Sequence, residues 1–203
     1  MMANSFRTIQ DILDASRRGD SLYSIYQGLE QSEALLKERQ KNAFELLFEI
    51  LIPSLTEDQA QELSRFPIES LEIYATNISI PIAQAISLYK GDKLFFKGVK
   101  QLNAILAKAL AQWQGNGLYL DGVQQLDKAT TKALAQWQGK WLYLNELKQL
   151  DEATAKALVH WQGEVLDLNG LQKLDEATAK ALAQYKGKIY TTYSISEQIN
   201  KFK

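Results

Sequence analysis

The chain of 203 residues contains no cysteine, only three prolines and a single histidine. The lack of cysteine excludes disulfides, thiolate metal sites and a cysteine nucleophile, and it fits a reducing compartment. No stretch approaches the ~20 apolar residues that cross a bilayer. The first residues, "MMANSFRTIQDILD", have no apolar core of signal-peptide length. We therefore expect no membrane span and a location in the cytoplasm, or export without a classical signal peptide.

The chain also lacks a charge of one sign, because its net charge is -1. This balance gives no reason to expect nucleic acid or an anionic membrane as a partner. With 46% hydrophobic and 23% charged residues, the composition is that of a soluble globular protein.

What the sequence does contain is a repeat. Three units read "LYLDGVQQLDKATTKALAQWQGKW", "LYLNELKQLDEATAKALVHWQGEV" and "LDLNGLQKLDEATAKALAQYKGKI", and looser copies begin at Leu71 and Leu94. An aromatic residue recurs every 24 residues, at Tyr89, Trp113, Trp137, Trp161 and Tyr185. A glycine follows each of them two residues later, at Gly91, Gly115, Gly139, Gly163 and Gly187. A fixed period of this length is typical of a solenoid.

Each unit predicts a short strand followed by a helix. Alternating residues such as Leu118 to Asp121 favour a strand, and the Ala-, Leu- and Lys-rich segment 129–138 favours a helix. An aspartate precedes each such helix and can cap its first turn, at Asp127, Asp151 and Asp175. The glycines that follow the helices suggest left-handed C-terminal caps. Stacked units would form a parallel β-sheet on one face and a row of helices on the other.

The unit "LxLxGLxxLD…AKALAQxxG" resembles a leucine-rich repeat, in a short bacterial-type variant. The family's inward strand positions match Leu118, Leu120, Leu142, Leu144, Leu166 and Leu168, and the following turn leucine matches Leu126, Leu150 and Leu174. The resemblance covers roughly Leu71 to Thr192. It departs from the family where a turn asparagine is usual, because Val99, Val123, Leu147 and Leu171 stand there. The resemblance implies binding of other macromolecules through a concave strand face, without catalysis.

The ends of the chain differ from the repeats. Residues 1–66 predict an all-helical N-terminal cap, with one long helix from Glu33 to Ile52 stopped by Pro53. The segment 55–66 echoes the helix of a unit. Residues 67–203 predict the solenoid, about five 24-residue units with a short C-terminal cap. A sixth strand begins at Ile189, and the 24-residue period places Tyr190 and Thr192 at the leucine positions of that strand.

Two sets of aromatic residues need separate interpretations. The helical spacing of Trp137 relative to Leu134 predicts that the tryptophan column is core packing. Strand residues alternate, so the residues between the inward leucines point outward. They include Phe95, Tyr119, Asp121, Trp141, Tyr143, Asn145, Asp167 and Asn169. Large aromatics on an open face often mark a contact site, and the alternative is stacking that only stiffens the sheet.

No constellation supports catalysis or a cofactor. Asp121 and Asp167 are expected two strands apart, ~10 Å, with nothing catalytic between them. His160 has no partner of metal-ligand type nearby in the sequence, and the lysine column of residues 132, 156 and 180 predicts a solvated helix face. We therefore predict a non-enzymatic module without cofactor or metal that binds a protein partner. The alternative is a structural protein that forms a homodimer through the aromatic face or the C-terminal edge strand.

Overall fold

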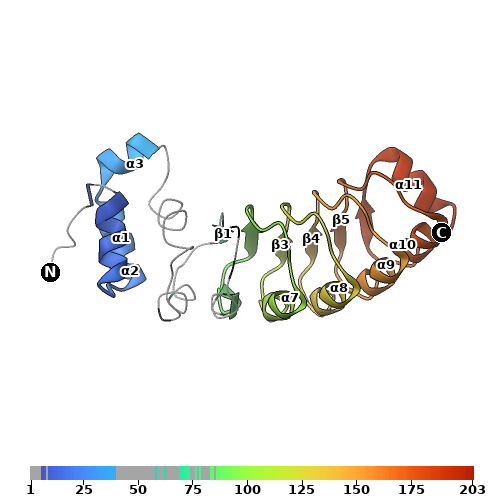
Figure 1. Ribbon diagram of the computed structural model, residues 1–203, viewed down its shortest axis with the longest axis horizontal. Helices are drawn as coiled ribbons and strands as arrows, with labels where there is room; N and C mark the ends of the chain where they lie inside the picture. Colours follow the sequence, from blue (N-terminus) through green and yellow to red (C-terminus); the bar gives the residue numbers. More distant parts are fainter. Residues whose placement is uncertain are drawn as a thin grey trace.

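The computed structural model describes residues 6–7, 9–39, 58, 62, 69–73, 76, 78, 83–84 and 86–203. In this part of the chain, six strands form one all-parallel sheet whose order follows the sequence. The strands and the helices between them are β1 (Ser70–Ile73), β2 (Lys93–Phe96), α7 (Ala104–Leu110), β3 (Gly117–Tyr119), α8 (Lys128–Leu134), β4 (Trp141–Tyr143), α9 (Glu152–Leu158), β5 (Val165–Asp167), α10 (Glu176–Leu182) and β6 (Lys188–Tyr190). Figure 1 shows the strands in one row and helices α7 to α10 in a second row, which is the layout of an α/β solenoid.

Further helices lie at the two ends of the solenoid (Figure 1). At the N-terminal end are α1 (Ile9–Arg17), α2 (Leu22–Glu30) and α3 (Glu33–Arg39). The long helix expected from Glu33 thus begins where predicted, but its continuation over 40–52, its stop at Pro53 and the segment 55–66 fall largely outside the described residues. At the C-terminal end, α11 (Tyr193–Asn200) buries Ile195 and Ile199. Within the described ranges, no helix is long and apolar enough to span a membrane.

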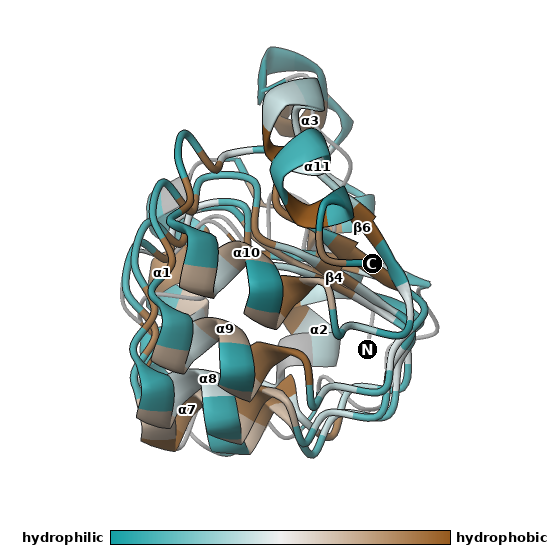
Figure 2. Ribbon diagram, turned by 90° about the vertical axis from the view of Figure 1, so that its right-hand side faces the viewer, coloured by the Kyte–Doolittle hydropathy of each residue, from teal (hydrophilic) through white to brown (hydrophobic). Residues whose placement is uncertain are grey.

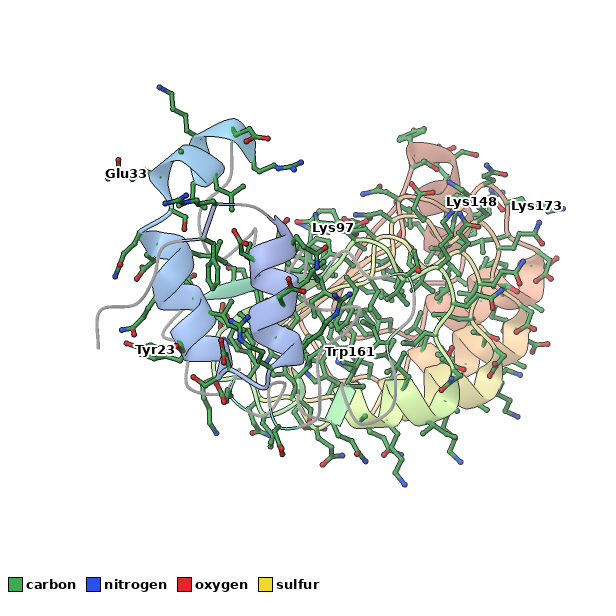
Figure 3. All side chains as sticks on the ribbon, turned by 60° about the vertical axis from the view of Figure 1, so that its left-hand side comes forward. Tyr23, Glu33, Lys97, Lys148, Trp161 and Lys173 are labelled. Atoms are coloured by element: carbon green, nitrogen blue, oxygen red, sulfur yellow. The ribbon has the colours of Figure 1, made fainter. Side chains whose placement is uncertain are left out.

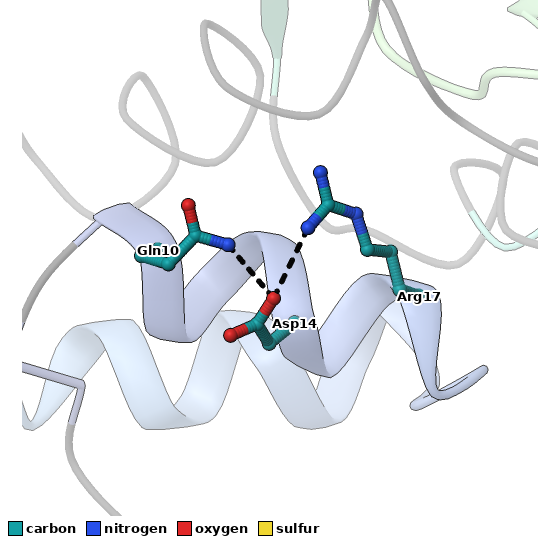
Figure 4. A network of polar contacts seen from close by, with 3 residues as sticks. All are labelled: Gln10, Asp14 and Arg17. Atoms are coloured by element: carbon teal, nitrogen blue, oxygen red, sulfur yellow. Dashed lines mark hydrogen bonds and ion pairs between the residues drawn. The ribbon is translucent and has the colours of Figure 1, made fainter.

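The turn after α1 contains a left-handed glycine. Gly19 has φ +83°, and its N–H donates to the carbonyl of Ser16 at 3.0 Å, while Asp20 donates to Ala15 at 3.1 Å. These two bonds form a Schellman motif, which ends the helix and turns the chain toward α2. On the outer surface of α1, Asp14 accepts hydrogen bonds from Gln10 at 2.8 Å and Arg17 at 3.2 Å (Figure 4).

The core lies between the sheet and the helices. All six strand leucines predicted to point inward are fully buried. Viewed along the solenoid, the apolar sides of the helices turn toward the strands (Figure 2). The tryptophan column fills the space between them, because Trp113, Trp137 and Trp161 are each 1% exposed and stack with ring centroids 5.7 and 5.8 Å apart. The prediction that this column is core packing is confirmed.

The start of each repeat helix follows the prediction. Asp127, Asp151 and Asp175 each accept a hydrogen bond from the backbone N–H three residues later, at 2.7–2.8 Å. Asn103 does the same for α7. The turn that lacks the family's asparagine is closed by backbone alone, because the N–H of Val123 donates to the Leu120 carbonyl at 3.0 Å. The buried apolar side chain of Val123 takes the place of a polar turn residue.

The end of each repeat helix corrects two predictions. Helix α8 ends at Leu134 rather than at residue 138, so Trp137 lies in the turn that follows it. Gly19 is the one described glycine with positive φ, so the repeat glycines are not left-handed caps. Glycine is required at these positions because a larger residue would overlap the preceding aromatic ring. A Cβ on Gly139, for example, would lie 2.0 Å from Cζ2 of Trp137. A Cβ on Gly115 would overlap the ring of Trp113 in the same way, and a Cβ on Gly163 would overlap the ring of Trp161.

The spacing between repeats differs across the thickness of the solenoid. On the outer side of the strands, the rings of Tyr119 and Tyr143 are 4.2 Å apart. In the interior, the rings of Trp137 and Trp161 are 5.8 Å apart. The stacked rings are therefore closer together on the outer strand side than in the interior, which is the order expected when the strand face is the concave one.

Trp137 is expected to be essential for stability. Replacing it with alanine leaves a cavity between two stacked indoles and also removes a hydrogen bond from its Nε1 to the Trp113 carbonyl, 3.1 Å. We expect Trp137→Ala to lose about 3–5 kcal/mol of unfolding free energy, measured by urea denaturation. Ile105→Ala on the exposed surface of α7 is the control and should change stability little. A Trp137→Ala variant that unfolds like the parent would contradict the burial of this ring.

The glycine contact can be tested separately. Gly139→Ala should cost about 1–3 kcal/mol, because the added methyl group overlaps the Trp137 ring. In a Trp137→Leu background the same change should cost much less, since the ring is gone. Urea denaturation of the four variants in this double-mutant cycle measures the coupling. An equal loss in both backgrounds would mean that Gly139 is required for its backbone conformation instead.

Candidate functional site

Three aromatic rings stand side by side in the middle of the concave face. Phe95, Tyr119 and Tyr143 occupy equivalent positions of β2, β3 and β4, where the strand register pairs each with the next. Adjacent rings are stacked, with centroids 4.0 and 4.2 Å apart and interplanar angles of 17° and 7°. We call these three rings the aromatic ladder. Because the rings cover one another's faces, each is half-buried and presents mainly its edge to solvent.

Tyr119, the middle ring of the ladder, is uncharged at neutral pH. Burial raises the pKa of Tyr119 to about 12, and the hydroxyl of Tyr143 and the nearby Asp121 act in the same direction. At one end of the ladder, the Lys97 ammonium lies 5.0 Å from the centroid of the Phe95 ring. This cation–π contact shows that a ring at the end of the stack attracts a positive charge.

Trp141 lies beside the ladder on β4. It is in register with Gly117 of β3, which has no side chain to separate it from the ladder. A Cβ on Gly117 would lie 3.0 Å from the Tyr119 ring and 3.4 Å from Cε3 of Trp141. The two aromatic residues therefore cover Gly117, which is buried although it points outward. Trp141 widens the apolar part of the face.

Polar side chains line the carboxyl ends of the central strands. The Asn145 side-chain amide donates to Oδ1 of Asp121 at 2.9 Å. Burial raises the pKa of Asp121, opposed by the charge of Lys97 and by this hydrogen bond. Within the described residues, Asn145 Oδ1 is buried and accepts no hydrogen bond. This edge of the face therefore keeps an acceptor for a donor that the described residues do not supply.

Asp167 stands where the ladder would continue onto β5. It is in register with Tyr143, is 8% exposed, and accepts a hydrogen bond from the N–H of Asn169 at 3.0 Å. Burial raises the pKa of this carboxyl despite the hydrogen bond. In the part of the chain that the structure describes, no lysine or arginine pairs with it. A buried carboxylate without a cation is costly, so Asp167 opposes folding at neutral pH.

The last strand corrects a prediction about Tyr190. The register pairs Leu166 with Ile189 and Asp167 with Tyr190, so Ile189 takes the leucine position and Tyr190 points outward. The sequence distance from Leu166 to Ile189 is one residue shorter than the distance between equivalent leucines of the central units. Thr192 is not a strand residue but precedes α11 as its N-cap. Tyr190 and Lys188 therefore lie on the concave face, on either side of the inward Ile189. The alternation of polar, aliphatic and aromatic residues in "KIY" indicates this orientation.

The eight residues predicted to contact a partner lie together on this one face. They come from β2 to β5 and the turns that follow these strands: Phe95, Tyr119, Asp121, Trp141, Tyr143, Asn145, Asp167 and Asn169. Asp121 and Asp167 belong to units two strands apart, and burial raises the pKa of both. Among the described residues, no group of three or more His, Asp or Glu side chains is placed to hold a metal ion.

Other polar clusters of the solenoid lie on its helix side and its loops. His160 is exposed in the turn after α9. Lys148 and Lys173 lie at the edge where the strands lead into loops, away from Trp161 in the interior (Figure 3). Lys148 pairs with Glu146 at 3.2 Å. Comparison of the chain with protein-family models, curated proteins and solved structures gave no significant match.

The buried charge of Asp167 predicts a pH-dependent stability. A pKa raised in the folded state means that the protonated form favours folding, so this contribution is present below the ordinary value of 3.8 and is lost as the pH rises through the raised value. Asp167→Asn keeps an acceptor for the Asn169 N–H and removes the charge. We expect it to unfold at higher urea concentration than the parent at about pH 7, with the difference gone near pH 3.

Asp151→Asn is the matched control for this experiment. Hydrogen bonds from Thr154 lower the pKa of Asp151, so its contribution is present above 3.8 and is lost as the pH falls through the lowered value. This variant should therefore be less stable than the parent at neutral pH, with the difference shrinking in acid. If Asp167→Asn were also less stable at neutral pH, the carboxylate would stabilise the fold.

Proposed function

We propose that this chain is a leucine-rich-repeat-like solenoid that binds a protein partner through its concave strand face, without catalysis. The observation that carries the proposal is the combination of apolar rings and buried polar groups on a face that no described helix covers (Figure 1). Repeat helices cover the opposite face of the sheet. A half-buried aromatic patch rimmed by polar groups is typical of a contact site.

The energetics of the face favour the same function. An apolar residue in place of Asp167, or a neutral one in place of Asp121, would avoid the burial of charge that raises both pKa values. Groups that oppose folding are common where a protein must recognise something. In this proposal residues 1–66 act as an all-helical cap of the first repeats, and the protein functions in the cytoplasm or after export without a classical signal.

A second candidate function is self-association at the C-terminal end. Tyr193 is 79% exposed, and Tyr190 and Phe202 also expose large parts of their rings. These three residues belong to β6, α11 and the residues after it, so a homodimer could form around the last strand. The aromatic residues of the ladder are less exposed than these.

One pair of double variants tests both candidates. Trp141→Ala with Tyr143→Ala removes two rings of the concave face but leaves the core unchanged, so we expect a stability loss of only about 1–2 kcal/mol. We expect this variant to lose the proteins that the parent captures from the native lysate. Tyr193→Ala with Phe202→Ala is the matched control and should retain them.

The same samples give the outcomes that would contradict the proposal. Unchanged capture by the concave-face variant means that the partner binds elsewhere. Mass measurement by light scattering then tests the second candidate. If the parent is a dimer and the C-terminal variant is a monomer, self-association is the function that the exposed aromatics serve.

A further inference from the structure

The aromatic ladder has a gap at β5. In the outward position of successive strands, β2, β3 and β4 carry aromatic rings, β5 carries Asp167 and β6 carries Tyr190. Tyr143 stacks on Tyr119 with an interplanar angle of 7°, so its other face turns toward Asp167. No ring stacks on that face among the described aromatics. The position therefore lacks one ring between two tyrosines.

The strand spacing leaves room for one planar group between the two tyrosine positions. Tyr143 and Tyr190 are two strands apart, which corresponds to about 9–10 Å between their positions in the sheet. A flat group in van der Waals contact with a ring on each side needs about 7–8 Å. Tyr190 is 42% exposed, so its ring can adjust to a guest. A second ring or a bulky aliphatic group would meet the carboxylate at the base of the gap.

The charge of the gap selects a cation. Asp167 forms its base, is nearly buried, and has no cationic partner in the described part of the chain. The ring of Tyr190 already attracts the ammonium of Lys188, which lies 4.6 Å from its centroid without forming an ion pair with Asp167. A cation between the rings would combine two cation–π contacts with a charge-assisted hydrogen bond to the carboxylate.

We propose that the gap between Tyr143 and Tyr190, with Asp167 at its base, binds the guanidinium group of an arginine side chain from the protein partner. Guanidinium is the cation of proteins that is both flat and able to donate several hydrogen bonds, whereas an ammonium group cannot stack between two rings. Asn145, two residues after Tyr143, has a buried Oδ1 that accepts no hydrogen bond among the described residues. This inference rests on the proposed function, because it specifies the chemistry recognised by the same face.

Peptide titration of the full chain tests the proposal. The probe is the blocked tripeptide acetyl-Gly-Arg-Gly-amide, compared with the same peptide carrying citrulline or lysine, and binding is followed by NMR shifts of the full chain. Citrulline keeps the shape of arginine without the charge. We expect the arginine peptide to bind at least about tenfold more tightly than the citrulline peptide, as for a lost hydrogen bond between charged groups. The lysine peptide should bind more weakly than the arginine peptide.

Two isosteric variants locate the site. Asp167→Asn should reduce the affinity for the arginine peptide to the affinity that the parent has for the citrulline peptide. Glu176→Gln, in the exposed first turn of α10 on the helix side of the sheet, should leave the affinity for the arginine peptide within about twofold of the parent's. Asp167→Asn is expected to fold at least as stably as the parent, so loss of binding would not reflect unfolding. Tyr190→Leu removes one of the two flanking rings and should also lower the affinity for the arginine peptide.

Three outcomes would overturn the inference. They are equal binding of arginine and citrulline peptides, unchanged binding by Asp167→Asn, and lysine binding as tight as that of arginine. Partner capture separates this failure from failure of the proposed function. If Asp167→Asn retains the partner but Trp141→Ala with Tyr143→Ala loses it, the concave face binds without an arginine. If neither variant changes capture, the concave face is not the binding face.

Discussion

Each central repeat of the solenoid depends on one contact, an indole ring lying against the glycine two residues after it. The Trp137 ring occupies the space where a Cβ of Gly139 would be, and this lets the chain pass from helix to strand directly over the ring. The same ring stacks on its neighbours in the adjacent repeats. One residue therefore closes its own repeat and sets the distance to the next. The strands of neighbouring repeats are in register over the same 24-residue period.

Periodicity made much of this architecture predictable. Leu142 and Leu144 alternate with outward residues at a period that only a half-buried strand explains, and both are fully buried. Asp151 stands directly before an alanine-rich segment, and it caps α9 as expected. The concave placement of Trp141 and Tyr143 follows from the same alternation. These features are local, so a single sequence contains the information for them.

Other features depend on contacts that spacing alone does not reveal. The position of a glycine after each helix predicts a left-handed cap, but Gly139 is required by the ring of Trp137, a contact that exists only once the chain has turned. A constant 24-residue period predicts that Tyr190 points inward, whereas the last repeat is one residue shorter and Tyr190 points outward. Helix α11 lies outside the repeat, and the helical spacing of Ile195 and Ile199 is the pattern that indicates it. Asp167 lies between two tyrosines of the concave face because Tyr190 points outward.

The two sides of the sheet have different physical roles. The inner side is apolar, and its fully buried leucines contribute stability without specificity. The outer side buries carboxylates at Asp121 and Asp167 and an unpaired amide oxygen at Asn145, all of which oppose folding. The stability of the inner side allows the outer side to carry these groups.

The unequal spacing of the two aromatic columns also determines how the solenoid can deform. On the concave side, the rings of Phe95 and Tyr119 are 4.0 Å apart, which is already close contact. Further bending would press these rings together against steep repulsion, whereas straightening would only loosen their stacking. The central repeats therefore resist bending in one direction far more than in the other, so they can open to admit a larger surface but cannot close further around a smaller one.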